Sequence, residues 1–447
     1  MRDEAPRRAA DRRWGALARR IPISLALLGA LVGPAAAEPL AHRESLPNGI
    51  RLLVASRPAI PVVVVRVYLR AGSVLDPPTA PGLANLTAEL LTRGTARRTG
   101  PELDRAIEFV GGSLDADASR DGVTVSLAVL KKDLDLGLDL LGEVLRTPAF
   151  PEDELKRTAG EIIGALRQSE ENPEVVAGRA LARLLYPGHP YAHPVSGDVA
   201  SVAALTRAQV VEFHRRYYRP DTALIAIVGD VTIDEARAGL ARRLGSWTAP
   251  AESVPVVPPA PLSPPVRAET IARDLTQATV YLGRPSIGHE SPDYFPLLVG
   301  NYVLGGGSAS RLYTRVREER GLAYSVYSGL SLGRYGAAYT VGLQTRVDAA
   351  AEAARLVRAE MVGMGRAPVD AKELGLAKAF LVGSFPLRLD TSRKVADLLV
   401  AIEEYGLGLD YPDRFRAGVE AVTAADVEKV AAKYMDPATF SSVTVTK

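Results

Sequence analysis

The stretch LTRAQVVEFHRRYYRPDTALIAIV, residues 205–228, has a counterpart in VTAADVEKVAAKYMDPATFSSVTV, residues 422–445. One constant offset aligns the two stretches without a gap, and the identities include Thr206 with Thr423, Tyr217 with Tyr434 and Pro220 with Pro437. Each copy predicts a helix capped by threonine, a turn at proline and then a strand. Because amphipathic patterning alone rarely reproduces spaced tyrosine, proline and threonine, we infer that one α/β domain has been duplicated.

A proline-rich segment separates the two copies. Seven prolines lie between Thr248 and Val266. Each fixes φ and removes an N–H donor, so neither a helix nor a central strand can pass through the segment. We predict an N-terminal domain over residues 38–247, a linker over 248–267 and a C-terminal domain over 268–447. Strands follow one another closely with helices grouped between them, which predicts an α+β layer rather than a doubly wound sheet.

The composition excludes several classes of protein. The 447 residues carry a net charge of +2, so bulk charge gives no case for binding nucleic acid. The chain has no cysteine, which rules out disulfides, thiolate zinc sites and cysteine nucleophiles.

Residues 1–37 have the pattern of a secretory signal peptide. Seven arginines precede a short apolar run at Ile23–Gly33, and the three alanines at 35–37 supply a small-residue cleavage site before Glu38. The apolar run is too short to span a bilayer, which takes about 20 residues. We expect export across the inner membrane, a periplasmic location in a bacterium, and no membrane span in the mature chain.

Several stretches resemble the pitrilysin/insulinase-type metallopeptidases. They are LPNGIRLLV (46–54), AGSVLDPPTAPGLAN (71–85), LYPGHPYAHPVSGD (185–198), YYRPDTALIAIVGDV (217–231) and LGGGSASRLYTRVREERGLAYSVYSGL (304–330). The similarity runs in order along the chain after residue 37, with the linker where that family joins its two domains. It implies two duplicated α/β domains of the metallopeptidase-roll type, and dimers with a peptide chamber between subunits.

In active members of that family, the helix that matches GLANLTAELLTRGT, residues 82–95, carries the inverted zinc motif H-x-x-E-H. The two histidines bind zinc from one helical face, the glutamate between them activates water, and a further glutamate ligand lies on a later helix. Here the histidine positions hold Asn85 and Glu89, and the glutamate position holds Ala88. Ala165, in GEIIGALRQSEENP, stands where the distal glutamate belongs.

These replacements predict a chain without zinc. A catalytic zinc site needs three protein ligands and an open position for water, whereas Ala88 cannot take up a proton and Ala165 cannot bind a metal. We interpret the helix as structural, with Asn85 and Glu89 solvated in a chamber. The alternative is an oxygen site for a harder ion on these two residues. No metal or other cofactor is expected in this chain.

The five histidines are predicted to lie at the surface or in turns: His42, His189, His193, His214 and His289. His189 and His193 share one loop and can bind a metal adventitiously, but the sequence shows no evident carboxylate partner for them.

The C-terminal half matches the family at Arg317 and Tyr324, seven positions apart in VREERGLAYSV. The resemblance implies that this pair binds the substrate backbone and steadies the oxyanion near zinc. The residues themselves predict a helix that stops at Gly321 and a strand after it, so the two side chains can meet at the junction. The structural alternative is that Arg317 caps the helix and Tyr324 packs in the sheet.

A second resemblance concerns peptide binding. Residues 111–127, GGSLDADASRDGVTVSL, resemble the edge strand on which substrate peptides pair in the active domain. Asp115 stands where active members often have asparagine, which leaves the role of this strand open.

We expect a zinc-free subunit that pairs with a homologous, zinc-bearing H-x-x-E-H subunit and lends it Arg317 and Tyr324 for the cleavage of extended peptides. The alternative is a homodimer that binds or escorts peptides without cutting them. A bilobal periplasmic solute-binding protein and an active peptidase with a relocated metal are two further alternatives.

Overall fold

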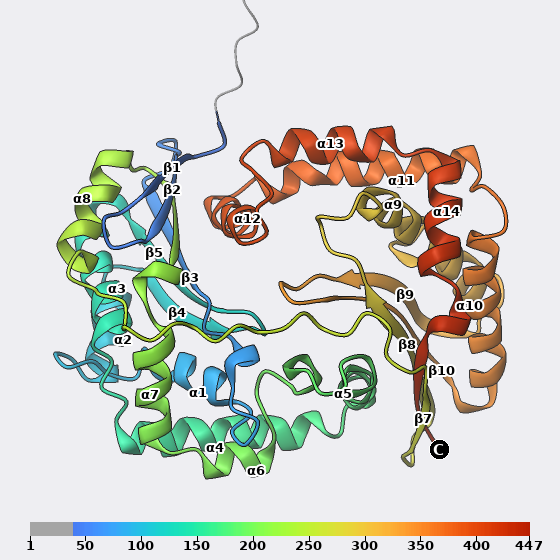
Figure 1. The fold of residues 1–447 in the computed structure, drawn as a ribbon, viewed down its shortest axis with the longest axis horizontal. Helices are drawn as coiled ribbons and strands as arrows, with labels where there is room; N and C mark the ends of the chain where they lie inside the picture. Colours follow the sequence, from blue (N-terminus) through green and yellow to red (C-terminus); the bar gives the residue numbers. More distant parts are fainter. Residues whose placement is uncertain (1–38) are drawn as a thin grey trace, which may run out of the picture. The chain divides into compact units, whose positions relative to one another are not determined.

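Two mixed β-sheets with the same strand order organise residues 39–447, the part of the chain that this computed structural model describes. The predicted signal peptide at residues 1–37 lies outside the described residues. The first sheet has the order β1-β2-β6-β3-β5-β4 and the second the order β7-β11-β8-β10-β9 (Figure 1). Strand β1 has no counterpart in the second sheet, but from β2, set against β7, the other five strands correspond one by one, and β2 pairs with β6 in parallel as β7 does with β11. The duplication therefore extends to the whole sheet, and the predicted α+β fold class is confirmed.

The elements of the first half are β1 His42–Ser45, β2 Arg51–Ser56, β3 Val62–Leu69, η1 Ser73–Leu75, α1 Leu83–Leu90, α2 Gly100–Phe109, β4 Ser113–Ala118, β5 Val123–Leu130, η2 Lys131–Asp133, α3 Leu134–Arg146, α4 Glu152–Ser169, α5 Pro173–Leu185, η3 Pro190–Ala192, α6 Val199–Ala204, α7 Arg207–Tyr217, η4 Pro220–Thr222, β6 Leu224–Gly229 and α8 Ile233–Leu244. Residues 248–267 contain neither a helix nor a strand.

The elements of the second half are β7 Ala268–Ala272, β8 Gln277–Ser286, α9 Tyr294–Gly305, the π-helix η5 Tyr313–Glu318, β9 Ala323–Ser331, β10 Ala337–Arg346, η6 Val347–Ala349, α10 Ala350–Met364, α11 Ala371–Ser384, η7 Phe385–Arg388, α12 Ser392–Glu404, α13 Tyr411–Ala421, α14 Ala424–Tyr434, η8 Pro437–Thr439 and β11 Ser441–Thr446.

The repeated stretch forms the same unit in both halves. Thr206 caps α7 by accepting a hydrogen bond from the backbone N–H of Gln209, and Thr423 caps α14 by accepting one from Asp426. Each cap is a reciprocal capping box, which satisfies two of the free donors at a helix N-terminus. A single 3-10 turn at proline, η4 or η8, then leads into β6 or β11. The predicted order of helix, turn and strand is confirmed in both copies.

The two halves exchange a helix. Helix α5 of the first half packs on β8 and β11 of the second sheet, and α12 of the second half packs on β3 and β6 of the first sheet (Figure 1). The buried contacts are apolar: Leu181 and Leu185 of α5 join Val443 and Val445 of β11, and Val395 and Leu399 of α12 join Leu224 and Val228 of β6. Each half therefore buries one face of the other half's sheet.

Ion pairs accompany the apolar contacts of α12. The buried carboxylate of Glu403 accepts hydrogen bonds from Arg43 at 2.8 Å and Arg51 at 2.9 Å, both from the first half. Asp397, earlier on the same helix, accepts from the buried Arg66 of β3 at 2.7 Å. A shift of α12 along the sheet would separate these pairs and leave buried charges without partners, which is unfavourable. These contacts therefore also set the position of α12 along the sheet.

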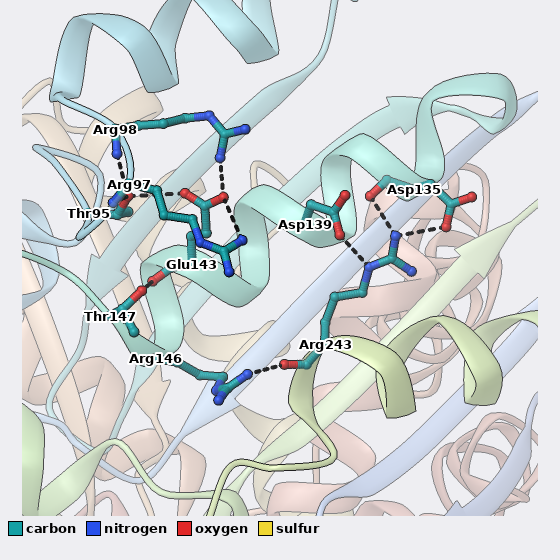
Figure 2. A network of polar contacts seen from close by, with 9 residues as sticks. All are labelled: Thr95, Arg97, Arg98, Asp135, Asp139, Glu143, Arg146, Thr147 and Arg243. Atoms are coloured by element: carbon teal, nitrogen blue, oxygen red, sulfur yellow. Dashed lines mark hydrogen bonds and ion pairs between the residues drawn. The ribbon is translucent and has the colours of Figure 1, made fainter.

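A polar network holds the segment that follows α1. Glu143 of α3 is buried and accepts hydrogen bonds from the Thr95 hydroxyl at 3.0 Å and from Arg98 (Figure 2). The same hydroxyl accepts from the backbone N–H groups of Arg97 at 3.1 Å and Arg98 at 3.0 Å. The turn after α1 is therefore fixed to α3 by one carboxylate.

Two predictions about this half need correction. The stretch at residues 82–95, matched to a helix from its sequence, is helical only over Leu83–Leu90, and Leu91–Arg93 form a turn before Gly94. His214, expected at the surface, packs between the rings of Phe150 and Tyr218, with ring centroids 5.4 and 4.6 Å away, and hydrogen-bonds through Nε2 to the Leu145 carbonyl oxygen at 3.0 Å. Amphipathic position alone does not show that α3 and its following loop cover this face of α7.

We predict that His214 makes the folded chain less stable in acid. Burial lowers its pKa from 6.5 to about 4. As the pH falls between these two values, His214 becomes protonated in the unfolded chain but stays neutral in the native chain, which lowers the free energy of unfolding. We expect the free energy of unfolding of the wild-type chain to fall more between about pH 7 and about pH 4.5 than that of the His214→Gln variant, measured by urea denaturation. Exposed His42 gives the control variant His42→Gln, which should keep the wild-type slope. Equal slopes for wild type and His214→Gln would contradict the assignment.

Candidate functional site

The N-terminus of α1 is held from two sides. The buried carboxylate of Asp76 accepts hydrogen bonds from the backbone N–H groups of Gly82 and Ala84, both at 2.8 Å. Burial raises the pKa of Asp76 to about 7, and the two backbone donors act in the opposite direction. Gly82 has a φ of +94°, and a Cβ there would lie 2.8 Å from the carbonyl oxygen of Ser196. Glycine is therefore required where the loop carrying Ser196 closes on the helix.

Asn85 and Glu89 lie one turn apart on the same face of α1, both half-buried. The Asn85 Nδ2 donates a hydrogen bond to Glu89 Oε1 at 2.9 Å. The prediction that both side chains are solvated did not include this hydrogen bond between them. Ala88, at the position of the catalytic glutamate in the resembling family, is fully buried and carries no polar atom.

Helix α4, which contains Ala165, packs against α1. Ala165 is exposed, and Glu161 lies one turn before it on the same helix. Burial raises the pKa of Glu89, the hydrogen bond from Asn85 and the charge of Arg93 lower it, and the negative charges of Glu161 and Asp117 raise it further. The sequence did not indicate Glu161 and Asp117 as charged neighbours of Glu89. The spacing of four from Ala165 could have indicated Glu161, but nothing local places Asp117 of β4 beside α1.

The donor set at this position does not fit a zinc ion. Two of the four motif positions are alanines, and the amide of Asn85 is engaged by Glu89. Within residues 39–447, no group of three or more His, Cys, Asp or Glu side chains has an arrangement that could hold a metal ion. The arrangement presents a half-buried carboxylate, Glu89, that is hydrogen-bonded by Asn85.

His189 lies in the turn where the sequence placed it, but its side chain is not at the surface. It is buried, its Nδ1 accepts a hydrogen bond from the backbone N–H of Tyr191 at 3.1 Å, and its Nε2 lies 3.0 Å from the carbonyl oxygen of Pro258. Nε2 thus joins the loop at 186–191 to the proline-rich segment, while Nδ1 stabilises the loop itself. His193 and His189 line the same cavity of about 600 Å³, in which Asp76 is also a lining residue.

Arg317 and Tyr324 are brought together at the start of the second sheet's outer strand. Arg317 lies in the π-helix η5, and its guanidinium carbon is 4.7 Å from the ring centroid of Tyr313 and 5.8 Å from that of Tyr324. Gly321, with a φ of +58°, turns the chain from η5 into β9. Arg317 is thus held in cation–π contact with two rings.

Tyr324 sits at a β-bulge. Ser325 pairs with Gln344 and Ala323 pairs with Thr345, which leaves Tyr324 as the extra residue of β9. A bulge redirects the side chain of the inserted residue, and Tyr324 is 74% exposed. The bulge and the π-helix are two irregularities that flank one arginine–tyrosine pair, and both kinds occur often at functional sites.

Comparisons with known proteins identify the family of the chain. Residues 51–199 match the insulinase family (peptidase family M16), and residues 204–381 match the peptidase M16 inactive domain. An uncharacterized zinc protease of Mycobacterium tuberculosis is 31% identical over 398 residues, covering 87% of this chain and 90% of the relative. A non-peptidase homolog of Helicobacter pylori is 27% identical over 366 residues, covering 82% and 84%.

Solved structures show the same fold. The crystal structure of a peptidase M16 inactive domain from Pseudomonas fluorescens superposes with a TM-score of 0.86 at 28% identity, covering 91% of this chain and 97% of that one. A protease from Helicobacter pylori gives the same TM-score at 20% identity, covering 92% and 100%. The chain belongs to the insulinase, or peptidase M16, family.

The three ligand positions can be tested by restoring them. The variant Asn85→His/Glu89→His/Ala165→Glu should bind about one zinc ion per chain, because α1 and α4 still present these positions side by side. Ala88 is left unchanged because it is buried and is not a ligand position. Metal content after dialysis, measured by plasma mass spectrometry, is the readout.

The double variant Asn85→His/Glu89→His lacks the distal carboxylate and should hold zinc more weakly. Tightly held, stoichiometric zinc in the wild-type chain would show that its own residues form a metal site elsewhere.

Proposed function

We propose that this chain is a zinc-free M16 subunit that pairs with a homologous, zinc-bearing H-x-x-E-H subunit to cleave extended peptides. The main observation behind the proposal is that Asn85, Ala88 and Glu89 of α1 and Ala165 of α4 stand at the motif positions. The N-terminus of α1 is nevertheless still fixed by hydrogen bonds to Asp76. A helix without a functional role would not need its N-terminus to be fixed by the buried Asp76 and the left-handed Gly82. The name of the Helicobacter pylori relative, a non-peptidase homolog, supports a member of this family without peptidase activity of its own.

The contribution of this chain to the shared site is the pair Arg317 and Tyr324. A guanidinium and a phenol are both donors, and together they can hold a peptide carbonyl and stabilise negative charge that develops on its oxygen. The exposure of Tyr324 suits this role, because a structural pair would be buried. Zinc is expected in the partner subunit only.

The location follows from the N-terminal pattern. We propose that residues 1–37 direct export and that the chain works in the periplasm, on peptides present there. Among residues 39–447, none of the helices has the length and apolar content needed to cross a bilayer.

A second candidate function is a homodimer that binds peptides without cleaving them. The observation that favours it is β4, which forms the free edge of the first sheet next to α1. A peptide can add to such an edge by main-chain hydrogen bonds whether or not a metal is present.

The proposed role of Arg317 can be measured in the complex. When the chain is co-expressed with an H-x-x-E-H homologue, peptidase activity should appear that neither chain has alone. Arg317→Ala should lower kcat/KM of the complex by about 100-fold, the effect of removing one charge-stabilising donor, of the order of 3 kcal/mol. Arg320 is three residues further on and exposed, so Arg320→Ala is the matched control and should leave activity unchanged.

Two outcomes would contradict the proposal. Full activity of the Arg317→Ala complex would remove this residue from the shared site. Failure of the two chains to co-purify, together with stable self-association, would favour the peptide-binding homodimer.

A further inference from the structure

The proline-rich linker between the two halves has a regular spacing of its own. Four prolines follow one another at intervals of three residues: Pro255, Pro258, Pro261 and Pro264. Over residues 254–261, here called the polyproline segment, every residue except Val256 is a proline or directly precedes one. Proline fixes φ near about −65°, and the residue before a proline is restricted to extended or polyproline II backbone. The sequence therefore favours a polyproline II helix over this segment.

The burial of the segment has the same period. A polyproline II helix has about three residues per turn, so residues three apart share a face. From position 254 to position 260, only Val254, Val257 and Ala260 are buried or half-buried. Val254 packs against the core of the first half, and Val257 and Ala260 pack in the apolar cluster around α5. The other two faces are exposed, and they consist of Pro255, Pro258, Val256 and Pro259.

The polyproline segment is held in place by both halves. The Nε2 of His189, from the first half, lies 3.0 Å from the carbonyl oxygen of Pro258. The backbone N–H of Ala260 donates a hydrogen bond to the carbonyl oxygen of Tyr335, from the second half, at 2.6 Å. Figure 1 shows the linker crossing from the first half to the second as one extended stretch. Because the segment is already ordered, a partner that binds it would lose little conformational entropy in fixing it.

The exposed faces combine proline rings with backbone acceptors. None of the hydrogen bonds within residues 39–447 ends on the carbonyl oxygens of Pro255, Val256 or Val257. Val256 is 94% exposed and adds an apolar side chain between the prolines. Domains that read polyproline II helices do so with grooves lined by aromatic residues, and a preformed helix lowers the entropic cost of binding. The segment therefore presents the surface that such a groove covers.

A positive charge follows the segment. Arg267, immediately before β7, has an exposed side chain, and no ion pair in the described part of the chain includes it. Its backbone N–H donates a hydrogen bond to Ser441 Oγ at 3.1 Å, which fixes its place beside the second sheet. A guanidinium at the end of an exposed segment complements an acidic rim on a partner.

We propose that the polyproline segment is a docking site for a second protein, a domain with an aromatic groove that reads polyproline II helices and with acidic residues facing Arg267. The faces with Pro255 and Pro258 and with Val256 and Pro259 enter the groove. The linker then has two roles, because it joins the halves and also recruits a partner. The proposal goes beyond the proposed function, since it needs neither zinc nor the pair Arg317 and Tyr324, and the partner is not the H-x-x-E-H subunit.

Photocrosslinking in the native cell tests the site. A full-length chain with p-benzoylphenylalanine in place of Val256 should form a discrete adduct with one other protein, identified by mass spectrometry. The crosslinked peptide of that protein should belong to a groove that contains tryptophan or tyrosine. Ile60 is also an exposed aliphatic residue, so the same replacement at position 60 is the matched control and should give no such adduct.

The captured protein, once purified, is the probe for calorimetry with the full chain. Val256→Ala should weaken binding by about 10-fold, the effect expected when two methyl groups are no longer buried. Ile60→Ala is the control and should bind like wild type. The double variant Pro255→Ala/Pro258→Ala should weaken binding further, because it removes two ring contacts and frees the backbone from the polyproline II conformation.

The charge is tested through its salt dependence. Arg267→Gln should weaken binding at low ionic strength and should bind like wild type at about 1 M salt, where exposed charges are screened. Arg366, an exposed arginine in the second half, gives the control Arg366→Gln, which should behave like wild type at both salt concentrations.

Three results would overturn the inference: equal adduct yields at positions 256 and 60, equal binding by Val256→Ala and wild type, or a crosslinked surface without an aromatic groove. An adduct with a second copy of this chain or with the H-x-x-E-H homologue would also overturn it, since the linker would then belong to a subunit interface. Peptidase activity of the complex is a separate readout. Val256→Ala should keep that activity, and Arg317→Ala should keep binding at the linker, so each proposal can fail without the other.

Discussion

The exchange of helices between the two halves is the interaction on which the rest of the structure depends. A sheet with two apolar faces needs a cover on each, and each half supplies helices for one face of its own sheet only. The second face is buried by α5 from the first half or α12 from the second. Because neither sheet is complete alone, the halves behave as one unit over residues 39–447. The linker is ordered for the same reason, since Val257 and Ala260 pack in the cluster around α5.

The helix that resembles a zinc-binding helix keeps its supports but not its ligands. Asp76, Gly82 and the turn tied to Glu143 still fix α1 in place. What has changed is the chemistry of one face, where an amide and a carboxylate hydrogen-bond to each other and Ala88 packs in the core. The fold of α1 does not depend on a metal, because the contacts that hold the helix lie on its other faces and at its ends.

Sequence reasoning succeeded for features that local patterns control. The capping threonines, the proline turns and the strands after them were predicted in both copies, because a cap and a turn depend on residues within a few positions. It failed for His214, which packs against α3 and the loop after it, and it did not foresee the burial of His189 by the proline-rich segment, because these partners are distant in sequence. The bulge at Tyr324 was also not predicted, because it is a property of pairing between two strands.

The sequence by itself determined the duplication and the family, and it predicted that Asn85, Ala88, Glu89 and Ala165 replace the zinc-motif residues, since these follow from residue identity at fixed spacings. Only the tertiary structure decided which charges meet at Glu89, where Arg317 lies relative to Tyr324, and which faces of the proline-rich segment stay exposed. The physical reason is that these features arise between elements far apart along the chain, where burial and register are set by packing and not by local preference.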